Sequence, residues 1–182
     1  MALRKALSYS KKPSRPYTRI SKKRGKSFIK RVPQNKIIKY QGGNIKDYEE
    51  GKHNFEVRLV SYEKIIVQVR DNALEASRML VNKTLEKNSP GQYYMEIKAH
   101  PHHFLRENKS AAAVAGADRI STGMSQAFGS IIGRAARVHP AGEIIFISCT
   151  NDKTARLARD TLVKVKSKMP CKTKVIFTKL KD

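Results

Sequence analysis

Acidic side chains are missing from the first 46 residues of this 182-residue chain, which carry fifteen Lys and Arg before the first acid, Asp47. Such a segment cannot condense on itself, because its charges repel one another and its few apolar groups cannot offset the entropy lost on ordering. It requires a polyanion to lie against. The sequence therefore predicts a basic extended arm over residues 1–35 and a single folded domain over residues 36–182.

Cysteine and long apolar runs are also scarce. Cys149 and Cys171 lie far apart and outside any CxxC pair, which excludes a disulfide framework and favours a reducing compartment. No stretch approaches the roughly twenty apolar residues of a membrane span, and no apolar segment follows Met1 as in a secretory signal. We expect a cytoplasmic chain without a membrane segment, either free or held in a large assembly.

Positive charge dominates the composition. The formal net charge is +23, of which residues 1–46 supply +15. Nucleic acid is favoured over an anionic membrane as the partner, because a membrane-surface segment pairs its charge with a broad apolar helix face. Here the apolar residues of the arm are scattered between Pro13, Pro16 and Pro33. Each phosphate contact releases counterions. The logarithm of the affinity should therefore fall by roughly 0.7 to 0.9 per contact for each tenfold rise in salt concentration.

Hydrophobic periodicity predicts two helices among several short strands. One helix is expected from Asn72, as N-cap with Glu75 completing a capping box, to about Asn88, and the other from Asn151 or Asp152 to the lysines at 164, 166 and 168. The expected strands are residues 36–40, 53–60, 64–70, 93–99, 134–139, 143–149 and 174–178. This order predicts an α+β fold with two helices packed on one face of a mostly antiparallel sheet.

A long internal loop is expected at about residues 106–133. Its first part is small and nearly featureless over residues 110–117, and loops of this length inside a domain are usually functional. Basic residues interleave with Ala and Gly in and beside it, which lets the backbone approach another surface closely. The sequence therefore predicts that this loop is buried in a partner.

Catalytic and metal motifs are weak. The segment from Gly123 to Ala127 lacks the closing glycine of a nucleophile elbow, and no phosphate-binding glycine motif is present. His100, His102 and His103 form a cluster, but no further ligand set is near in sequence, so we expect neither a metal nor a cofactor. An RNA-processing or RNA-binding protein that uses the His100–His103 cluster remains an alternative function.

Aromatic residues interleave with the charges of the arm. Tyr9, Tyr17 and Phe28 either stack on unpaired bases or anchor the arm to its own domain. The sequence leaves both roles open.

Several blocks, in order, resemble one family. These blocks are residues 71–78 (DNALEASR), 100–109 (HPHHFLRENK), 115–119 (AGADR), 122–124 with 127–129 (TGM and AFG), and 136–138 (ARV). Together they resemble the large-subunit ribosomal proteins called L-sixteen in bacteria and L-ten-e in archaea and eukaryotes, and the archaeal branch most. The resemblance covers most of the chain, including the arm.

The resemblance implies a fold, a function and partners. The fold would be an α/β hammerhead-like sandwich, and the protein a non-enzymatic monomer within the ribosome that binds large-subunit rRNA near the elbow of the A-site tRNA. The loop from Arg106 to about Asp118 would point toward the P-site tRNA and the peptidyl transferase centre, with ribosomal proteins as neighbours. The chain departs from the family at Ser125, Ser130 and Ile131, where basic residues or Lys-Pro are usual, and at Arg134, where a small polar residue is usual.

Two sets of site residues follow from the charge pattern and the resemblance. The predicted RNA-binding residues are Arg4, Lys5, Lys11, Lys12, Arg15, Arg19, Lys22, Lys23, Arg24, Lys26, Lys30, Arg31, His102, Arg106, Lys109, Arg119, Arg134 and Arg137. The predicted tRNA-facing loop comprises Arg106, Glu107, Asn108, Lys109, Ser110, Ala111, Ala112, Ala113, Val114, Ala115 and Gly116.

Overall fold

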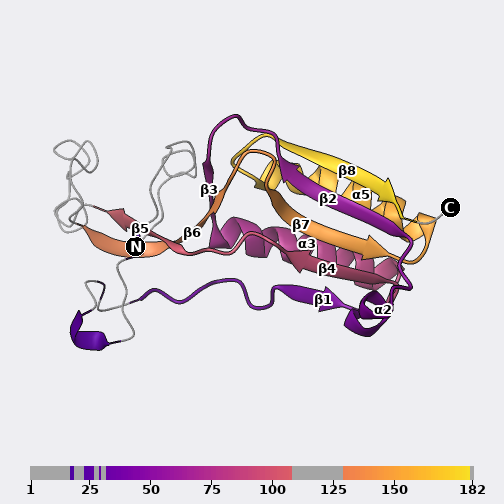
Figure 1. Cartoon of the computed structure of the whole chain (residues 1–182), viewed down its shortest axis with the longest axis horizontal. Helices are drawn as coiled ribbons and strands as arrows, with labels where there is room; N and C mark the ends of the chain where they lie inside the picture. Colours follow the sequence, from indigo (N-terminus) through magenta and orange to yellow (C-terminus); the bar gives the residue numbers. More distant parts are fainter. Residues whose placement is uncertain (1–16, 19–22, 27–28, 30–31, 108–128, 181–182) are drawn as a thin grey trace.

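Five antiparallel strands form the larger of two sheets in the computed structural model, which describes residues 17–18, 23–26, 29, 32–107 and 129–180 (Figure 1). The strand order in this large sheet is β1 (Gln41–Gly43), β4 (Tyr93–Ile97), β7 (Glu143–Cys149), β2 (Phe55–Ser61) and β8 (Thr173–Lys179). Residues alternate between its two faces, so Val57, Leu59 and Ile147 point to one side and are fully buried.

Two long helices cover one face of the large sheet and pack against each other. They are α3 (Asp71–Asn88) and α5 (Asp152–Val165), the latter followed by a single 3-10 turn, η3 (Lys166–Lys168). Their buried stripes recur at helical spacing, as expected for amphipathic helices. The stripes comprise Leu74, Ser77, Val81 and Leu85 on α3, and Thr154, Ala155, Ala158, Thr161, Leu162 and Val165 on α5.

A smaller antiparallel sheet extends away from this body. Its strand order is β3 (Val67–Arg70), β6 (Ser130–Val138) and β5 (His103–Glu107). Figure 1 shows β5 and the first half of β6 at one end of the molecule, where the short turn η1 (Arg24–Lys26) also lies. We call this three-stranded unit the small sheet. The predicted α+β class with a mostly antiparallel sheet is confirmed.

The predicted strand at 36–40 is wrong, and so is the predicted N-cap of α3. Contacts of Asp71, at the start of α3, account for both differences. The helix begins at Asp71, one residue before the expected cap, and Asn72 makes no capping bond. Asp71 instead accepts hydrogen bonds from Asn72 N at 2.9 Å and from Lys36 N at 3.2 Å. Residues 36–40 thus run along α3, and the paired register with β4 starts at Gln41, just after the Tyr40 carbonyl, which accepts a hydrogen bond from Ile97 N at 2.8 Å.

The short helix α2 (Ile45–Glu49) was not predicted. Asn44 caps it by accepting a hydrogen bond from Asp47 N at 3.3 Å. The chain reaches that cap through Gly43, whose φ of 85° and close approach to Tyr93 leave no room for a side chain. Tyr48 of α2 then stacks on Tyr94 of the large sheet, with ring centroids 4.2 Å apart. A tertiary aromatic contact therefore supports a helix too short to be recognised by periodicity.

Strand β6 begins at Ser130, four residues before the predicted Arg134, and β5 extends through Arg106 and Glu107. Both ends of the predicted loop therefore belong to the small sheet, where Glu107 pairs with Ser130. The remainder of the predicted loop, residues 108–128, lies outside the described residues.

Candidate nucleic-acid interface

The small sheet concentrates positive charge. Its three strands contain four arginines, at positions 70, 106, 134 and 137, and a single acid, Glu107. Within the described residues, neither Arg134 nor Arg137 forms an ion pair. Arginine presents a planar fork of donors that suits phosphate oxygens. This sheet therefore has the side chains and the charge that an RNA backbone requires.

The register of the small sheet assigns its cations to faces. Gln68 pairs with Arg137, while Phe104 pairs with Arg134. The guanidinium of Arg134 lies 5.4 Å from the Phe104 ring centroid, a cation–π geometry. Because side chains alternate along β6, Arg134 and Arg137 lie on opposite faces. The sheet is thus basic on both faces.

Tyr17 ties the arm to the small sheet. Its backbone N–H donates to His103 Nδ1 at 2.7 Å, and its carbonyl accepts from Phe104 N at 3.0 Å. The Arg106 guanidinium lies 3.9 Å from the centroid of the Tyr17 ring. Of the two roles left open for the arm aromatics, Tyr17 therefore has the anchoring one. Tyr9 and Phe28 lie outside the described residues.

A second attachment lies at the end of the arm. Arg134 Nε donates to the carbonyl of Pro33 at 2.8 Å, and Ile29 is only 3% exposed. The arm thus contacts its own domain at residues 17 and 33. These contacts hold part of the arm against β5 and β6 of the small sheet.

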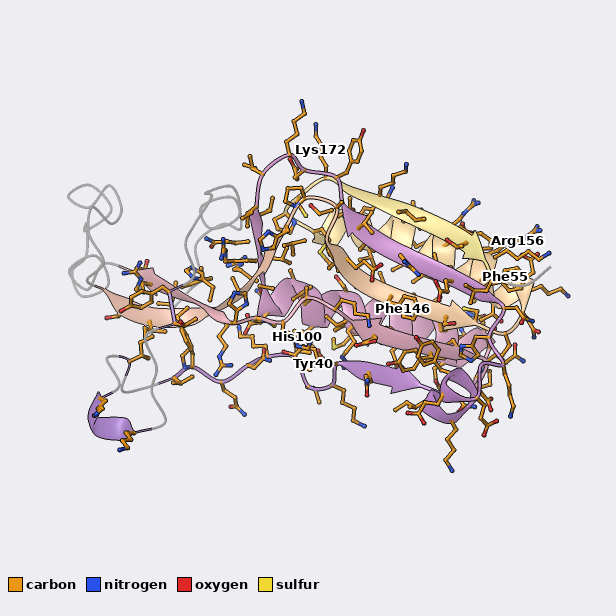
Figure 2. The ribbon with its side chains drawn as sticks, viewed as in Figure 1. Tyr40, Phe55, His100, Phe146, Arg156 and Lys172 are labelled. Atoms are coloured by element: carbon orange, nitrogen blue, oxygen red, sulfur yellow. The ribbon has the colours of Figure 1, made fainter. Side chains whose placement is uncertain are left out.

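The three clustered histidines have separate environments. His103 is buried, and burial, followed by the charges of Arg106, His102 and Arg137, lowers its pKa to about 4. His102 is exposed, with Nδ1 3.0 Å from the carbonyl oxygen of His100. The His100 ring stacks on the Tyr40 ring, with ring centroids 4.4 Å apart; both residues are labelled in Figure 2. No group of His, Cys, Asp or Glu in the described part of the chain is placed to hold a metal ion.

The depressed pKa of His103 predicts acid sensitivity. Below its ordinary pKa of about 6.5, the unfolded chain binds a proton that the folded chain does not. Protonation of His103 therefore leaves the free energy of unfolding unchanged above pH 6.5. As pH falls from 6.5 toward 4, the free energy of unfolding decreases, by up to about 3 kcal/mol in total. We expect the unfolding midpoint to fall over this window.

Two variants isolate the contribution of His103 to this acid sensitivity. His103→Gln should show a flatter pH profile, because Gln accepts the Tyr17 hydrogen bond without titrating. The exposed His139 provides a matched control as His139→Gln. Equal pH profiles for His103→Gln and the unmodified chain would contradict the assignment.

Two cations of the large sheet are balanced by acids. On the open face of the large sheet, Arg58 pairs with Glu143 at 3.1 Å, and Lys98 pairs with Glu96 at 2.6 Å. Both cations also lie over the Phe146 ring, labelled in Figure 2. Exposed pairs of this kind contribute little stability, but they neutralise the surface. This part of the large sheet is therefore close to neutral, unlike the small sheet, where four arginines face a single acid.

Seven of the predicted RNA-binding residues can be located. Lys23, Arg24 and Lys26 belong to the η1 region, His102 precedes β5, and the remaining three, Arg106, Arg134 and Arg137, lie on the small sheet. Those outside the described residues are Arg4, Lys5, Lys11, Lys12, Arg15, Arg19, Lys22, Lys30, Arg31, Lys109 and Arg119. RNA binding by either set stays a prediction.

Arg70 was missed as a candidate, although it continues the same basic surface. It follows Val67 and Val69, which are buried, and it lies on the same face of β3 as Gln68. The alternation of Val67 and Val69 with Gln68 and Arg70 was a usable signal.

No described helix has the length and hydropathy needed to cross a bilayer.

Comparison with known proteins gives one consistent result. The family described as "Ribosomal protein L16p/L10e" matches residues 14–176. The "Large ribosomal subunit protein uL16" of Staphylothermus marinus is 40% identical over 182 residues, covering 100% of this chain and 97% of that protein. Proteins of the same name from Picrophilus torridus, 40% identical over 92% of this chain and 93% of that protein, and from Saccharolobus islandicus, 38% identical over 96% and 92%, are also similar. The chain belongs to the ribosomal protein L16p/L10e family.

Proposed function

We propose that this chain is a structural, non-enzymatic component of the large ribosomal subunit that binds large-subunit rRNA through its arm and small sheet. The observation that carries the proposal is the small sheet itself, with four arginines, one acid and the docking point of the arm at Tyr17. Relatives of nearly equal length bear the name of a large-subunit protein. The predicted cytoplasmic location follows from that assembly.

The mechanism is electrostatic and positional. Arm cations neutralise rRNA phosphates and release counterions, which provides affinity independent of sequence. The hydrogen bonds of Tyr17 to β5 and of Pro33 to β6 fix where the arm leaves the domain. Contacts with phosphates set the position of a protein on RNA, rather than reading its bases. The folded domain thus orients the arm along rRNA.

A finer proposal concerns tRNA. Because Glu107 pairs with Ser130, the predicted loop joins the outer ends of two hydrogen-bonded strands. A rigid strand pair is a suitable support for a segment that must reach a distant site. We place the domain near the elbow of the A-site tRNA, with the loop from Arg106 to about Asp118 toward the P-site tRNA and the peptidyl transferase centre. Other large-subunit proteins would be its neighbours.

The geometry of His103 gives no support to the histidine-based alternative. Nδ1 of His103 already accepts the Tyr17 hydrogen bond, and the ring is 6% exposed. A general base must reach the proton that it removes. A buried, occupied imidazole does not meet that requirement.

Sedimentation tests the proposed function. We expect the chain to travel with large subunits at moderate salt and to be released only at high salt, because its retention depends on phosphate contacts. Immunodetection across a salt series of sucrose gradients provides the measurement. Quantitative recovery in the ribosome-free fraction at moderate salt would overturn the proposal.

A further inference from the structure

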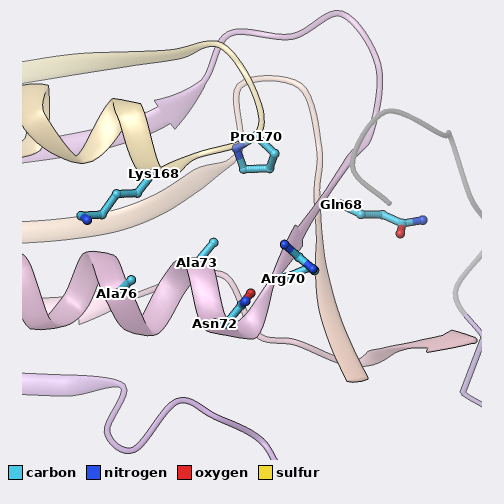
Figure 3. A pocket seen from close by; sticks show the side chains of 7 residues that line it. All are labelled: Gln68, Arg70, Asn72, Ala73, Ala76, Lys168 and Pro170. Carbon is cyan, nitrogen blue, oxygen red and sulfur yellow. The ribbon is translucent and has the colours of Figure 1, made fainter. Parts of the chain in front are cut away.

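Strand β8 forms an open edge of the large sheet. It is last in the strand order, and among the described residues it pairs only with β2 (Figure 1). The chain reaches β8 from η3 through Pro170, which is labelled in Figure 3. An edge strand presents a row of backbone groups that can pair with another chain. The large sheet can therefore accept a further strand on this side.

The pairing with β2 determines which backbone groups of β8 face outward. At one end, Tyr62 N donates to the carbonyl of Lys172 at 2.8 Å. At the other end, Leu180 N donates to the carbonyl of Asn54, also at 2.8 Å, and the register between these ends has no shift. Backbone groups along an antiparallel strand point alternately toward and away from the partner, so the even-numbered residues of β8 face β2. The N–H and C=O groups that point to the open edge include those of Thr173, Val175 and Phe177.

Strand β8 lacks most of the features that protect an edge. Protected edges are short, contain proline or carry a bulge. The opposite edge of the large sheet, β1, has only three residues, whereas β8 has seven, with no proline and an uninterrupted register. Apolar side chains are also accessible here, because Ile176 is 39% exposed and Phe177 is 40% exposed. The edge thus combines outward backbone groups with apolar surface.

The two exposed apolar side chains lie on opposite faces of the sheet. Ile176 is directly opposite Arg58, and Phe177 is directly opposite Val57, which is buried under the helices. The Phe177 ring also lies near the ring of Phe55, with centroids 5.9 Å apart. A strand added beside β8 would cover part of both exposed side chains.

Lysines set the charge that this edge favours in a partner. Residues 161–181 contain seven lysines and no acid. Lys172, labelled in Figure 2, and Lys174 are exposed at the start of β8, and neither forms an ion pair in the described part of the chain. Lysine on an edge disfavours pairing with a second copy of the same strand, because like charges would meet in one sheet. A strand that carries acidic residues would instead find complementary charge.

We propose that β8 is a docking edge for an extended acidic segment of a neighbouring large-subunit protein, which pairs with it as an additional strand. This inference deepens the proposed function and rests on it. An RNA backbone accepts hydrogen bonds chiefly through phosphate oxygens, which cannot serve the outward carbonyls of β8. A polypeptide offers both donors and acceptors at the spacing of a strand. The segment would place apolar residues beside Ile176 and Phe177, and Asp or Glu beside Lys174.

Hydrogen exchange of the unmodified chain tests the docking edge. Exchange is measured at residue level by mass spectrometry in the purified chain, in the chain bound to purified large-subunit rRNA, and in intact large subunits. The amides of Val175 and Phe177 should exchange fast in the first two states and at least about a hundredfold more slowly in intact subunits. The amides of Lys174 and Ile176 face β2, so they serve as the internal control and should be slow in all three states.

A charge-reversed variant tests the acidic character of the partner. In large subunits reconstituted with the full-length variant Lys174→Glu, the amides of Val175 and Phe177 should lose their added protection, because the acidic segment is repelled. Lys83→Glu, which reverses an equally exposed charge on α3, provides the matched control and should keep it. Carbodiimide crosslinking of unmodified subunits should join Lys174 to Asp or Glu of another protein.

Each other result is decisive. Fast exchange of Val175 and Phe177 in intact subunits would overturn the docking edge and leave the proposed function intact, since the chain would still be in the subunit. Protection by rRNA alone would assign the edge to RNA, and protection that rises with the concentration of the purified chain would assign it to a second copy; both would contradict the inference. Equal protection in the two variants would refute an acidic partner. Absence of the chain from large subunits would overturn the proposed function itself.

Discussion

A chain that lacks residues 1–16 is expected to lose most of its affinity for large-subunit rRNA. The truncation removes five cations, Arg4, Lys5, Lys11, Lys12 and Arg15, and keeps Tyr17 with its bonds to His103 and Phe104. If each cation contacts one phosphate, the slope of log affinity against log salt concentration should become shallower by roughly 4. At about 0.1 M salt this corresponds to a loss of up to about four decades in affinity.

The control for this truncation keeps chain length and removes only charge. A full-length variant with Gln at the same five positions should match the truncated chain in rRNA titrations. Both should unfold at the temperature of the unmodified chain, because the described core comprises residues 37–169. A truncated chain with unchanged affinity and slope would show that the first sixteen residues do not bind rRNA.

Deletion of Ser110 to Val114 is expected to leave the domain folded but to reduce translation severalfold. The five residues, Ser-Ala-Ala-Ala-Val, carry no amphipathic stripe, and Glu107 and Ser130 on either side of the segment are paired in the small sheet. Stability should therefore change little, whereas the proposed reach toward the P-site tRNA would be shortened. Thermal unfolding of the purified chain and peptide synthesis by reconstituted ribosomes provide the two measurements.

A replacement variant separates the length of this segment from its chemistry. Five Gly and Ser residues in place of Ser110–Val114 restore the span without the apolar side chains. Partial recovery of peptide synthesis would assign the defect to lost reach. If the deletion abolished the folded domain instead, the segment would belong to the core and its proposed role would be wrong.

The elements that the sequence predicts best are those with local signals. Strand β7 has the predicted bounds, Glu143–Cys149, because a compact Ile-rich run lies between Gly142 and the start of a helix. The second helix starts at Asp152, one of the two predicted starting residues, and its buried residues recur at helical spacing. In both cases, hydrophobic pattern and boundary residues agree, so little depends on the tertiary environment.

Tertiary contacts explain what the sequence could not predict. Residues 36–40 have the composition of a strand, yet Lys36 N donates to Asp71 and Ile38 N to Glu75 across the fold. The carboxylate expected to cap α3 locally also pairs with Arg78, at 2.7 Å. The partners of Lys36 and Ile38 lie more than thirty residues away along the sequence, and short-range patterns do not contain them.

The candidate site was predictable by residue type, but not by arrangement. Basic residues flanking the long loop identified Arg106, Arg134 and Arg137, and strand register then decided which faces they occupy. The docking of Tyr17 on His103 joins residues 86 positions apart.

Crosslinking of the chain within intact large subunits, with protein and RNA sites both mapped, tests the rRNA-binding proposal most directly. The proposal predicts crosslinks to large-subunit rRNA from peptides of the arm and from β5 and β6, with few from the exposed, acid-paired Arg156 on α5. Crosslinks confined to α5, or a complete absence of rRNA from the arm and small sheet, would contradict it.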